Sequence, residues 1–143
     1  MTIHIRPATE LEQSTLRGII SAAHLDPTNL HWPNFVVAEW DGQLAGIAQI
    51  KPHTDCREFG SLVVLPAYRK RGIAAQLIEH CLANESKNIY LLCRDNMESF
   101  YMRWGFQRIP CAEAPPTLRI KLAAATVMRV IGIRIISMRR DPH

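Results

Sequence analysis

Hydrophobic and polar residues alternate in several short segments, and each segment is bounded by residues that favour turns. Such alternation is typical of strands with one buried face, and it predicts strands at 3–5, 35–40 and 44–50. Asp41-Gly42 separates the last two, and Asp-Gly is a strong hairpin signal, so these two strands are expected to pair antiparallel. Further strands are predicted at about 57–65, 89–93, 106–109 and 133–138.

Helical periodicity occupies the segments between these strands. Apolar residues recur at helical spacing over 11–20, before Asp26-Pro27 interrupts the pattern. A second helix is predicted after residue 72, because apolar side chains there follow the i, i+3, i+4, i+7, i+8 spacing of a stripe that faces a core. Two more helices are predicted, a short one at 97–104 and one at 116–128 that starts at Pro115-Pro116.

The composition limits the class of protein. With 143 residues, of which 48% are hydrophobic, the chain is long enough for one domain with a core and too short for two ordinary ones. We therefore expect a single domain over 1–143, with 110–132 as a helical insertion before the last strand. The four cysteines lack the paired spacing of a zinc site, no signal peptide or lipidation motif is visible, and no apolar run reaches the roughly 18 residues that span a bilayer. These features predict a cytoplasmic protein without a metal site or a membrane span.

Positive charge is concentrated near the end of the chain. The net charge is +4, and six of the 17 Lys and Arg residues follow residue 116, where Asp141 is the only acidic side chain. Such a tail either attracts acidic substrates, nucleic acid or anionic membranes by long-range electrostatics, or forms a solvated surface. The dispersal of these cations among aliphatic residues favours the solvated surface, so no specific nucleic-acid partner is expected.

The segment from 62 to 75 carries the clearest chemical signal. An apolar strand ends at Pro66, and the cations Arg69-Lys70-Arg71 then precede Gly72 at the start of a helix. Cations at a helix N-terminus oppose the macrodipole by about 0.3 to 1 kcal/mol each, and a bound anion would reverse that sign. The free N–H groups of a first helical turn also let a phosphate approach the main chain. The pattern predicts a pyrophosphate site, and the alternative explanation is a solvated basic turn.

The chain resembles the GNAT superfamily of N-acetyltransferases in three segments. The superfamily signature Gln/Arg-x-x-Gly-x-Gly/Ala is matched by Arg69-Lys70-Arg71-Gly72-Ile73-Ala74. The segment Phe100-Tyr101-Met102-Arg103-Trp104-Gly105-Phe106 is similar to the Tyr-x-x-x-Gly-Phe element, and Ile3-His4-Ile5-Arg6-Pro7-Ala8 is similar to the first strand. This resemblance, which covers most of residues 1–109, implies an α/β fold with a mixed, mostly antiparallel central sheet, a splayed pair of parallel strands, and helices on both faces.

The resemblance also implies acetyl-CoA as co-substrate. The phosphates would lie on the turn from Lys70 to Ala75, and the pantetheine arm would pair with the fourth predicted strand as an additional strand. A backbone N–H near Val64 would then polarise the thioester carbonyl. The residues assigned to cofactor binding are Leu62, Val63, Val64, Arg69, Lys70, Arg71, Gly72, Ile73, Ala74 and Ala75.

Glu58 is the candidate general base. It precedes Arg69 by eleven residues, the spacing at which histone acetyltransferases of this superfamily carry their base. Strand alternation places it on one face with apolar residues further along the strand, which would shield it from water. The alternatives are a strand-edge carboxylate paired with Arg57 or solvent, and a water chain ending at backbone groups, as in many relatives. His53 and Asp55 are expected to be turn or surface residues.

Tyr101 is the candidate acid, because it occupies the position from which family tyrosines reach the cofactor sulfur. A phenol with a pKa near 10 is a weaker acid than a thiol near 8.5, so full proton transfer to the departing thiolate is uphill by about 2 kcal/mol. Hydrogen bonding to the developing charge is therefore the expected role. The alternative is an aromatic side chain that packs beside Phe100 and Trp104.

Together these features predict an N-acetyltransferase that transfers acetyl from acetyl-CoA to a primary amine by direct attack in a ternary complex. The alternative is a non-catalytic module that senses acyl-CoA. The expected acceptor is a small-molecule or peptide amine, and within a peptide either an α-amine or a lysine side chain is a possible acceptor. Trp32 and the 110–132 segment are expected to shape this choice. Small relatives often form dimers, which implies a homodimer.

Overall fold

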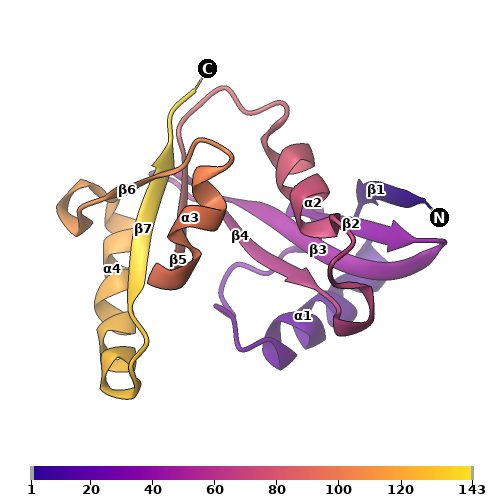
Figure 1. Cartoon of the computed structure of the whole chain (residues 1–143), viewed down its shortest axis with the longest axis horizontal. Coiled ribbons are helices and arrows are strands. Elements are labelled where there is room, and N and C mark those ends of the chain that lie inside the picture. The colour runs from indigo at the N-terminus through magenta and orange to yellow at the C-terminus, as the bar shows by residue number, and fades with distance from the viewer. Residues whose placement is uncertain (1, 143) are drawn as a thin grey trace. The chain divides into compact units, whose positions relative to one another are not determined.

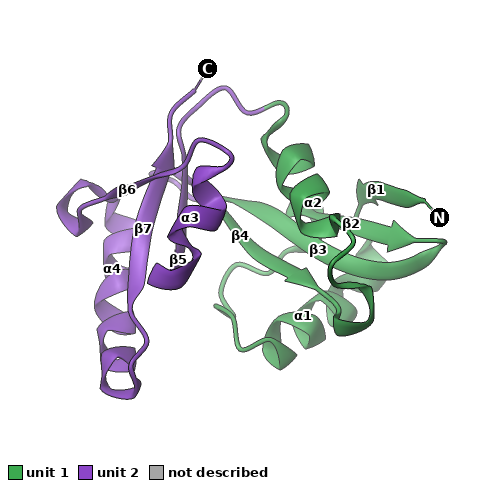
Figure 2. Cartoon of the chain, in the orientation of Figure 1, with its two compact units in different colours: residues 1–51, 59–84 green, residues 52–58, 85–143 purple. Residues whose placement is uncertain are grey.

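The computed structural model describes residues 2–142, and its seven strands form a sheet in the order β1-β2-β3-β4-β5-β7-β6 (Figure 1). Contacts divide the chain into two compact units, unit 1 (1–51 and 59–84) and unit 2 (52–58 and 85–143), which Figure 2 colours separately. The strands are β1 (Ile3–Pro7), β2 (Phe35–Trp40), β3 (Gln43–Pro52), β4 (Arg57–Val64), β5 (Ile89–Arg94), β6 (Gln107–Ile109) and β7 (Ile135–Arg140), and the α-helices are α1 (Gln13–Ala22), α2 (Ile73–Leu82), α3 (Glu98–Met102) and α4 (Pro116–Ala125).

The predicted hairpin of unit 1 is confirmed by β2 and β3, which pair antiparallel with Ala38 opposite Gly46. Asp41 and Gly42 connect the two strands with φ angles of 48° and 81°. Two successive positive φ angles are what a tight two-residue hairpin turn requires, and Asp-Gly adopts them at low cost. β1 pairs antiparallel with the other edge of β2.

Helices α1 and α2 cover opposite faces of the strands in unit 1 (Figure 1). Ile47 of β3 packs in a hydrophobic cluster that includes Leu16 of α1. The adjacent Gly46 faces Ile73 and Leu77 of α2. Because neighbouring residues of a strand point to opposite faces, the two helices lie on opposite sides of β3.

An ion-paired turn joins β1 to α1 in unit 1. The Glu12 carboxylate accepts hydrogen bonds from both Nη atoms of Arg6, at 2.9 and 2.8 Å, and from the Thr9 N–H at 2.9 Å. Arg6 Nε also lies 3.3 Å from a carboxylate oxygen of Glu39. The hydrogen bonds from Arg6 are the main reason why the pKa of Glu12 falls to about 2.

Unit 2 contains the parallel pair of the sheet. Arg57 and Glu58, at the start of β4, lie opposite Ile89 and Tyr90 of β5 in parallel register. β7 pairs antiparallel with β5 and with β6. The sheet is therefore mixed and mostly antiparallel, as the family resemblance implied.

Helices α3 and α4 cover opposite faces of β5. Leu92 of β5 packs in a cluster with Leu118 and Leu122 of α4. The next residue, Cys93, lies on the other face, where it interacts electrostatically with Tyr101 of α3. The predicted helices on both faces of the sheet are thus present in unit 2 as well.

The segment 110–132 is largely helical, as predicted, but its boundaries differ from the prediction. The α-helix ends at Ala125 and continues as a 3-10 helix over Thr126–Ile131. Gly132 follows with a φ of 81°, a left-handed conformation that ends the helix. The last strand, predicted at 133–138, starts and ends two residues later, because the chain must first leave this turn before it can pair with β5.

Candidate functional site

The turn between β4 and α2 has the backbone geometry of an anion site. Gly72, directly before α2, has a φ of 78°, and Lys70 has a φ of 64°. No atom lies within 4 Å of where a Cβ on Gly72 would stand, so this side of the turn is open. The helix begins with Ile73, Ala74 and Ala75, and their N–H groups have no acceptor within the helix because they belong to its first turn. The backbone here can therefore donate to a phosphate.

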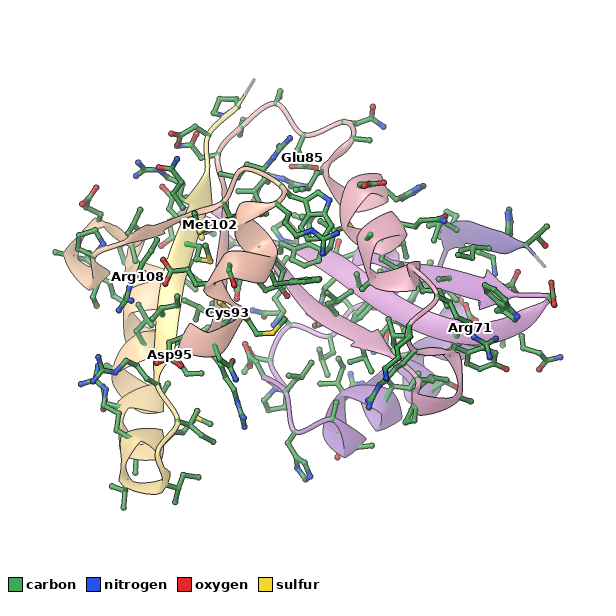
Figure 3. All side chains as sticks on the ribbon, in the orientation of Figure 1. Arg71, Glu85, Cys93, Asp95, Met102 and Arg108 are labelled. Atoms are coloured by element: carbon green, nitrogen blue, oxygen red, sulfur yellow. The ribbon has the colours of Figure 1, made fainter. Side chains whose placement is uncertain are left out.

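Two cations of this turn are already held by other groups of unit 1. Arg69 donates from Nε to the Val64 carbonyl oxygen at 3.3 Å, which ties the turn to the end of β4. The Arg71 guanidinium lies 4.7 Å from the ring centre of Trp40 and 5.7 Å from that of Tyr68, as cation–π contacts (Figure 3). These contacts hold two of the three cations of the turn in place.

Two features of β3 and β4 that support this turn were missed by the sequence analysis. A Cβ on Gly46 would lie 3.0 Å from the Val63 carbonyl oxygen, so glycine permits the close approach of the two strands. Ser61, inside β4, has a φ of 57°, and its hydroxyl accepts a hydrogen bond from Gln49 Nε2 at 2.8 Å. The glycine inside an apolar strand was a visible signal, whereas nothing local marked the serine.

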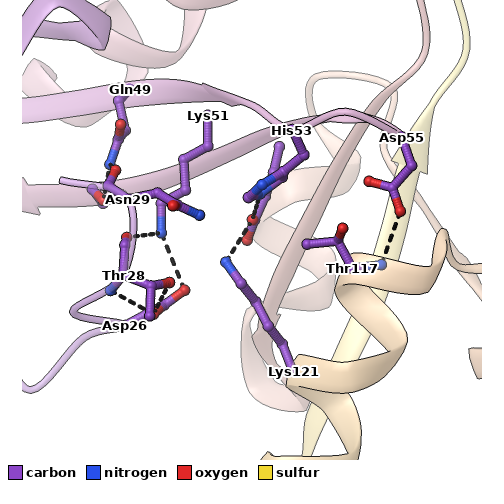
Figure 4. Close-up of polar contacts among 11 residues, drawn as sticks. Asp26, Thr28, Asn29, Gln49, Lys51, His53, Asp55, Thr117 and Lys121 are labelled. Atoms are coloured by element: carbon purple, nitrogen blue, oxygen red, sulfur yellow. Dashed lines mark hydrogen bonds and ion pairs between the residues drawn. The ribbon is translucent and has the colours of Figure 1, made fainter. Parts of the chain in front are cut away.

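Glu58 contacts two basic side chains, His53 in the loop before β4 and Lys121 of α4, both of which Figure 4 labels. Its Oε1 is 2.8 Å from His53 Nε2 and accepts a hydrogen bond from Lys121 Nζ at 2.9 Å. The expected shielding from water is found, since the Glu58 side chain is 6% exposed. The prediction that this carboxylate has apolar neighbours is wrong, because Lys121 of α4 contacts it. His53, predicted as a turn or surface residue, has a side chain that is only 8% exposed.

The loop before β4 is fixed to α4 by a second contact. The Asp55 carboxylate accepts a hydrogen bond from the Thr117 N–H at 2.9 Å, in the first turn of α4, and this bond lowers the pKa of Asp55 (Figure 4). The next residue, Cys56, packs against the hydrophobic cluster beneath α4. Burial, together with the negative charge of Asp55, raises the pKa of the Cys56 thiol to about 12. The inserted helix therefore contacts this loop at Asp55 and Cys56 in addition to the ion pair of Lys121 with Glu58.

Tyr101 is buried in α3 and surrounded by aromatic rings. Its ring centre lies 5.1 Å from that of Phe100 and 6.1 Å from that of Phe106, both in edge-to-face geometry. Burial raises the pKa of the phenol well above its ordinary value, and nearby Cys93 adds to this effect. The phenol therefore stays protonated at neutral pH.

A further polar cluster in unit 1 was not expected from the sequence. Lys51 is 2% exposed, and its ammonium contacts Asp26 Oδ2 at 3.1 Å and the Thr28 carbonyl oxygen at 3.0 Å (Figure 4). Gln49, on the same face of β3, donates to the Asn29 carbonyl oxygen at 3.3 Å. Its own Oε1 is buried and has no hydrogen-bond partner among the described residues. These contacts fix the loop after α1 to β3, because a buried ammonium is stable only when it is paired.

The predicted site residues divide between the two units. All the residues assigned to cofactor binding belong to unit 1, and Glu58 and Tyr101 belong to unit 2. Within unit 2, Glu58 faces α4 and Tyr101 lies on α3, so the two are on opposite faces of β5. In the described part of the chain, no group of three or more His, Cys, Asp or Glu residues could hold a metal ion, and no helix is long and apolar enough to cross a membrane.

Solved structures with the same fold include several acetyltransferases. N-acetylglutamate synthase from Neisseria gonorrhoeae, complexed with coenzyme A and N-acetyl-glutamate, superposes with a TM-score of 0.76 at 23% identity, over 100% of this chain and 36% of that chain. Rv2747 from Mycobacterium tuberculosis, in complex with CoA, has a TM-score of 0.75 at 14% identity, over 98% of this chain and 99% of that chain. The ribosomal-protein-S18-alanine N-acetyltransferase from Escherichia coli has a TM-score of 0.70 at 15% identity, over 99% of this chain and 94% of that chain. The chain thus spans about a third of the length of the gonococcal synthase.

Comparison at the level of sequence identifies the family. Among curated proteins, none matches the chain significantly. A family model described as an acetyltransferase (GNAT) domain matches residues 31–108, which is more than half of the chain and includes the turn before α2 and Tyr101. The chain therefore belongs to the GNAT family of acetyltransferases.

Proposed function

We propose that this protein is an N-acetyltransferase that transfers the acetyl group of acetyl-CoA to a primary amine by direct attack in a ternary complex. The observation that supports it most is the open turn at Gly72, where the first-turn N–H groups of α2 suit a pyrophosphate. Lys70 to Ala75 would hold the phosphates, and the backbone of Leu62 to Val64 would hold the pantetheine arm. When bound, acetyl-CoA supplies an acyl group that is already activated, so no side-chain nucleophile is required.

The acceptor amine must be neutral before it can attack. At pH 7 an amine with a pKa of about 10.4 is neutral in about one molecule in 2500, which corresponds to about 4.6 kcal/mol. Glu58 is the residue that we assign to accept the proton, since its contacts with Lys121 and His53 hold the carboxylate in one orientation. For an amine with a pKa near 8 the cost is only about 1.4 kcal/mol, so Glu58 matters most for lysine-like acceptors.

We assign Tyr101 to stabilise the leaving group, which is the thiolate of coenzyme A. As the new carbon–nitrogen bond forms, the carbon–sulfur bond breaks and negative charge develops on sulfur. Tyr101 donates a hydrogen bond to that sulfur, and the raised pKa of the phenol means that it stabilises the charge without giving up its proton fully.

The names of two structural relatives suggest a class of acceptor for this proposal. One of them is named for N-acetylglutamate, and another for the alanine of a ribosomal protein. We infer that this chain acetylates the amine of an amino acid or of a protein. The inserted helix α4 contributes to the choice between them, because its Lys121 contacts the proposed base.

Acetyl-CoA consumption measured against a panel of amines tests the proposal. Tyr101→Phe is expected to lower kcat by about 10- to 100-fold with little change in KM, which is the loss of one hydrogen bond to a charged group. Tyr90→Phe in β5 is the matched control and should stay within about twofold of the unaltered protein. Glu58→Gln is expected to lower kcat by about 100-fold for lysine-like amines and by less for α-amines.

The control for Glu58 is Glu85→Gln, because Glu85 is also a paired carboxylate, with Arg57 Nε at 2.6 Å, but has no assigned role in the reaction. Binding of coenzyme A without turnover for any amine would refute the enzyme and support the sensor alternative. Equal losses for Tyr101→Phe and Tyr90→Phe would refute the role of Tyr101.

A further inference from the structure

We propose that unit 2 contains a separate binding site for a small organic anion that carries two or more negative groups on an apolar body. The site is a cavity of about 310 Å³ between β6, β7 and the helical segment that follows residue 115. Its volume is at the lower end of the range for small-molecule pockets. It includes none of the residues assigned to cofactor binding, and neither Glu58 nor Tyr101, although α4, which the proposed function links to the choice of acceptor, forms one of its walls.

Four arginines from four different elements line this cavity. Arg108 lies on β6, Arg119 on α4, Arg129 in the 3-10 helix after α4, and Arg134 directly before β7 (Figure 3 labels Arg108). The fold therefore gathers charges that are far apart in the sequence. Three of them belong to the basic tail, and they are exposed, as a solvated surface predicts, but the folded chain groups them around one cavity.

These charges have little compensation within the protein. Arg108 Nη1 lies 3.6 Å from Glu98 Oε1, which is a long and partly exposed ion pair. No carboxylate within residues 2–142 pairs with Arg119, Arg129 or Arg134. No acidic residue is among those that line the cavity, all of which the structure describes. Like charges around a shared space repel one another, and a bound anion would remove that repulsion.

The type of side chain further defines the ligand. Guanidinium groups are planar and donate two parallel hydrogen bonds, a geometry that matches carboxylate and phosphate groups. Several such groups around one cavity suit a ligand with more than one anionic group.

The apolar part of the cavity indicates that the ligand is more than an inorganic ion. Ile109, Leu122 and Ile135 line it together with the arginines. A simple phosphate or sulfate would contact the guanidinium groups and leave this apolar surface in water, whereas an organic anion with an apolar body would cover it. The combination of a cationic rim and an apolar wall therefore favours a compound such as an aromatic or branched dicarboxylate, or a phosphate ester of similar size.

Titration of the full chain with phthalate at about 0.15 M salt tests this site, with binding followed by calorimetry. The double variant Arg119→Gln, Arg134→Gln is expected to weaken phthalate binding by at least tenfold, and Arg129→Gln alone by several fold. Arg17→Gln in α1 is the matched control, since Arg17 is an exposed arginine of unit 1, and it should leave the affinity unchanged. Cys111 lines the cavity, so phthalate should also slow the alkylation of its thiol, as measured by peptide mapping.

Two comparison compounds distinguish the contribution of charge to binding from the contribution of apolar contact. Sulfate carries charge without an apolar body, and benzamide carries an apolar ring without charge, so both are expected to bind more weakly than phthalate. Sulfate that binds as tightly as phthalate would refute the apolar contribution. Equal phthalate affinity in the double variant and the unaltered protein, or displacement of phthalate by coenzyme A, would refute the site.

Coenzyme A affinity measured on the same variants distinguishes this inference from the proposed function. It should be unchanged in all of them, and urea denaturation shows independently that the variants are folded. Loss of phthalate binding with coenzyme A binding intact supports the anion site, whatever the outcome of the turnover assays.

Discussion

Replacing Gly46 with alanine tests how closely β3 packs against β4 and α2. The added Cβ would lie 3.0 Å from the Val63 carbonyl oxygen, 3.1 Å from Leu77 Cδ1 and 3.3 Å from Ile73 Cγ2. The leucine terminus can turn away, but the carbonyl belongs to the backbone of β4, so the strand itself must shift. Overpacking of this kind costs about 1 to 3 kcal/mol, and the favourable effect of replacing a strand glycine offsets about 0.5 to 1 kcal/mol. We expect a net loss of about 1 to 2 kcal/mol in the free energy of unfolding.

Gly18→Ala is the matched control for this substitution. Gly18 lies in α1 with no atom within 4 Å of its Cβ position, so the same added methyl group should stabilise the protein, by up to about 1 kcal/mol. Urea denaturation at neutral pH measures both effects. Because Val63 belongs to the proposed pantetheine-binding stretch, Gly46→Ala should also weaken coenzyme A binding, whereas Gly18→Ala should not. A Gly46→Ala variant as stable as the unaltered protein would refute the packing argument.

Two further predictions concern titratable groups. Glu12→Gln should lower stability by about 1 to 2 kcal/mol at pH 7, less than the roughly 3 kcal/mol implied by a pKa lowered from 4.5 to about 2, because the pair with Arg6 is partly exposed. The carboxylate is the stabilising form, so this difference should disappear as the pH falls from about 4.5 to 2, and a difference that persists in acid would contradict the assignment. Alkylation at pH 8 should modify the exposed Cys111 before Cys56 and Cys93, whose pKa values burial raises to about 12. Peptide mapping over time measures the order, and similar rates for all three would be inconsistent with the structure.

The sequence predicted the elements well wherever a local signal sets them. Alternation and the Asp41-Gly42 turn defined the hairpin, and the cationic turn before Gly72 located the start of α2. The prediction of a helix at 116–128 was less accurate, because the change from α-helix to 3-10 helix depends on packing rather than on residue preference. The same is true of β7, whose limits are set by its pairing with β5.

The environment of Glu58 shows what local pattern cannot supply. Its position and burial could be predicted, but Lys121 is 63 residues away in the sequence and reaches Glu58 only because α4 packs on the sheet. The arginine-lined cavity is a similar case, since Arg108 and Arg134 come together only in the folded chain. Contacts of this kind depend on tertiary packing, which periodicity along the chain does not encode.

The stacking of Arg71 on Trp40 and Tyr68 has a consequence for the entropy of ligand binding. Immobilising a long side chain when a ligand binds costs about 0.5 to 1.5 kcal/mol. In this protein the aromatic rings restrict Arg71 before any ligand arrives, so most of that loss of rotamer freedom has already occurred during folding. At the proposed anion site, Trp40 would therefore raise the affinity by preorganising the cation beside it, even without a contact between its ring and the ligand.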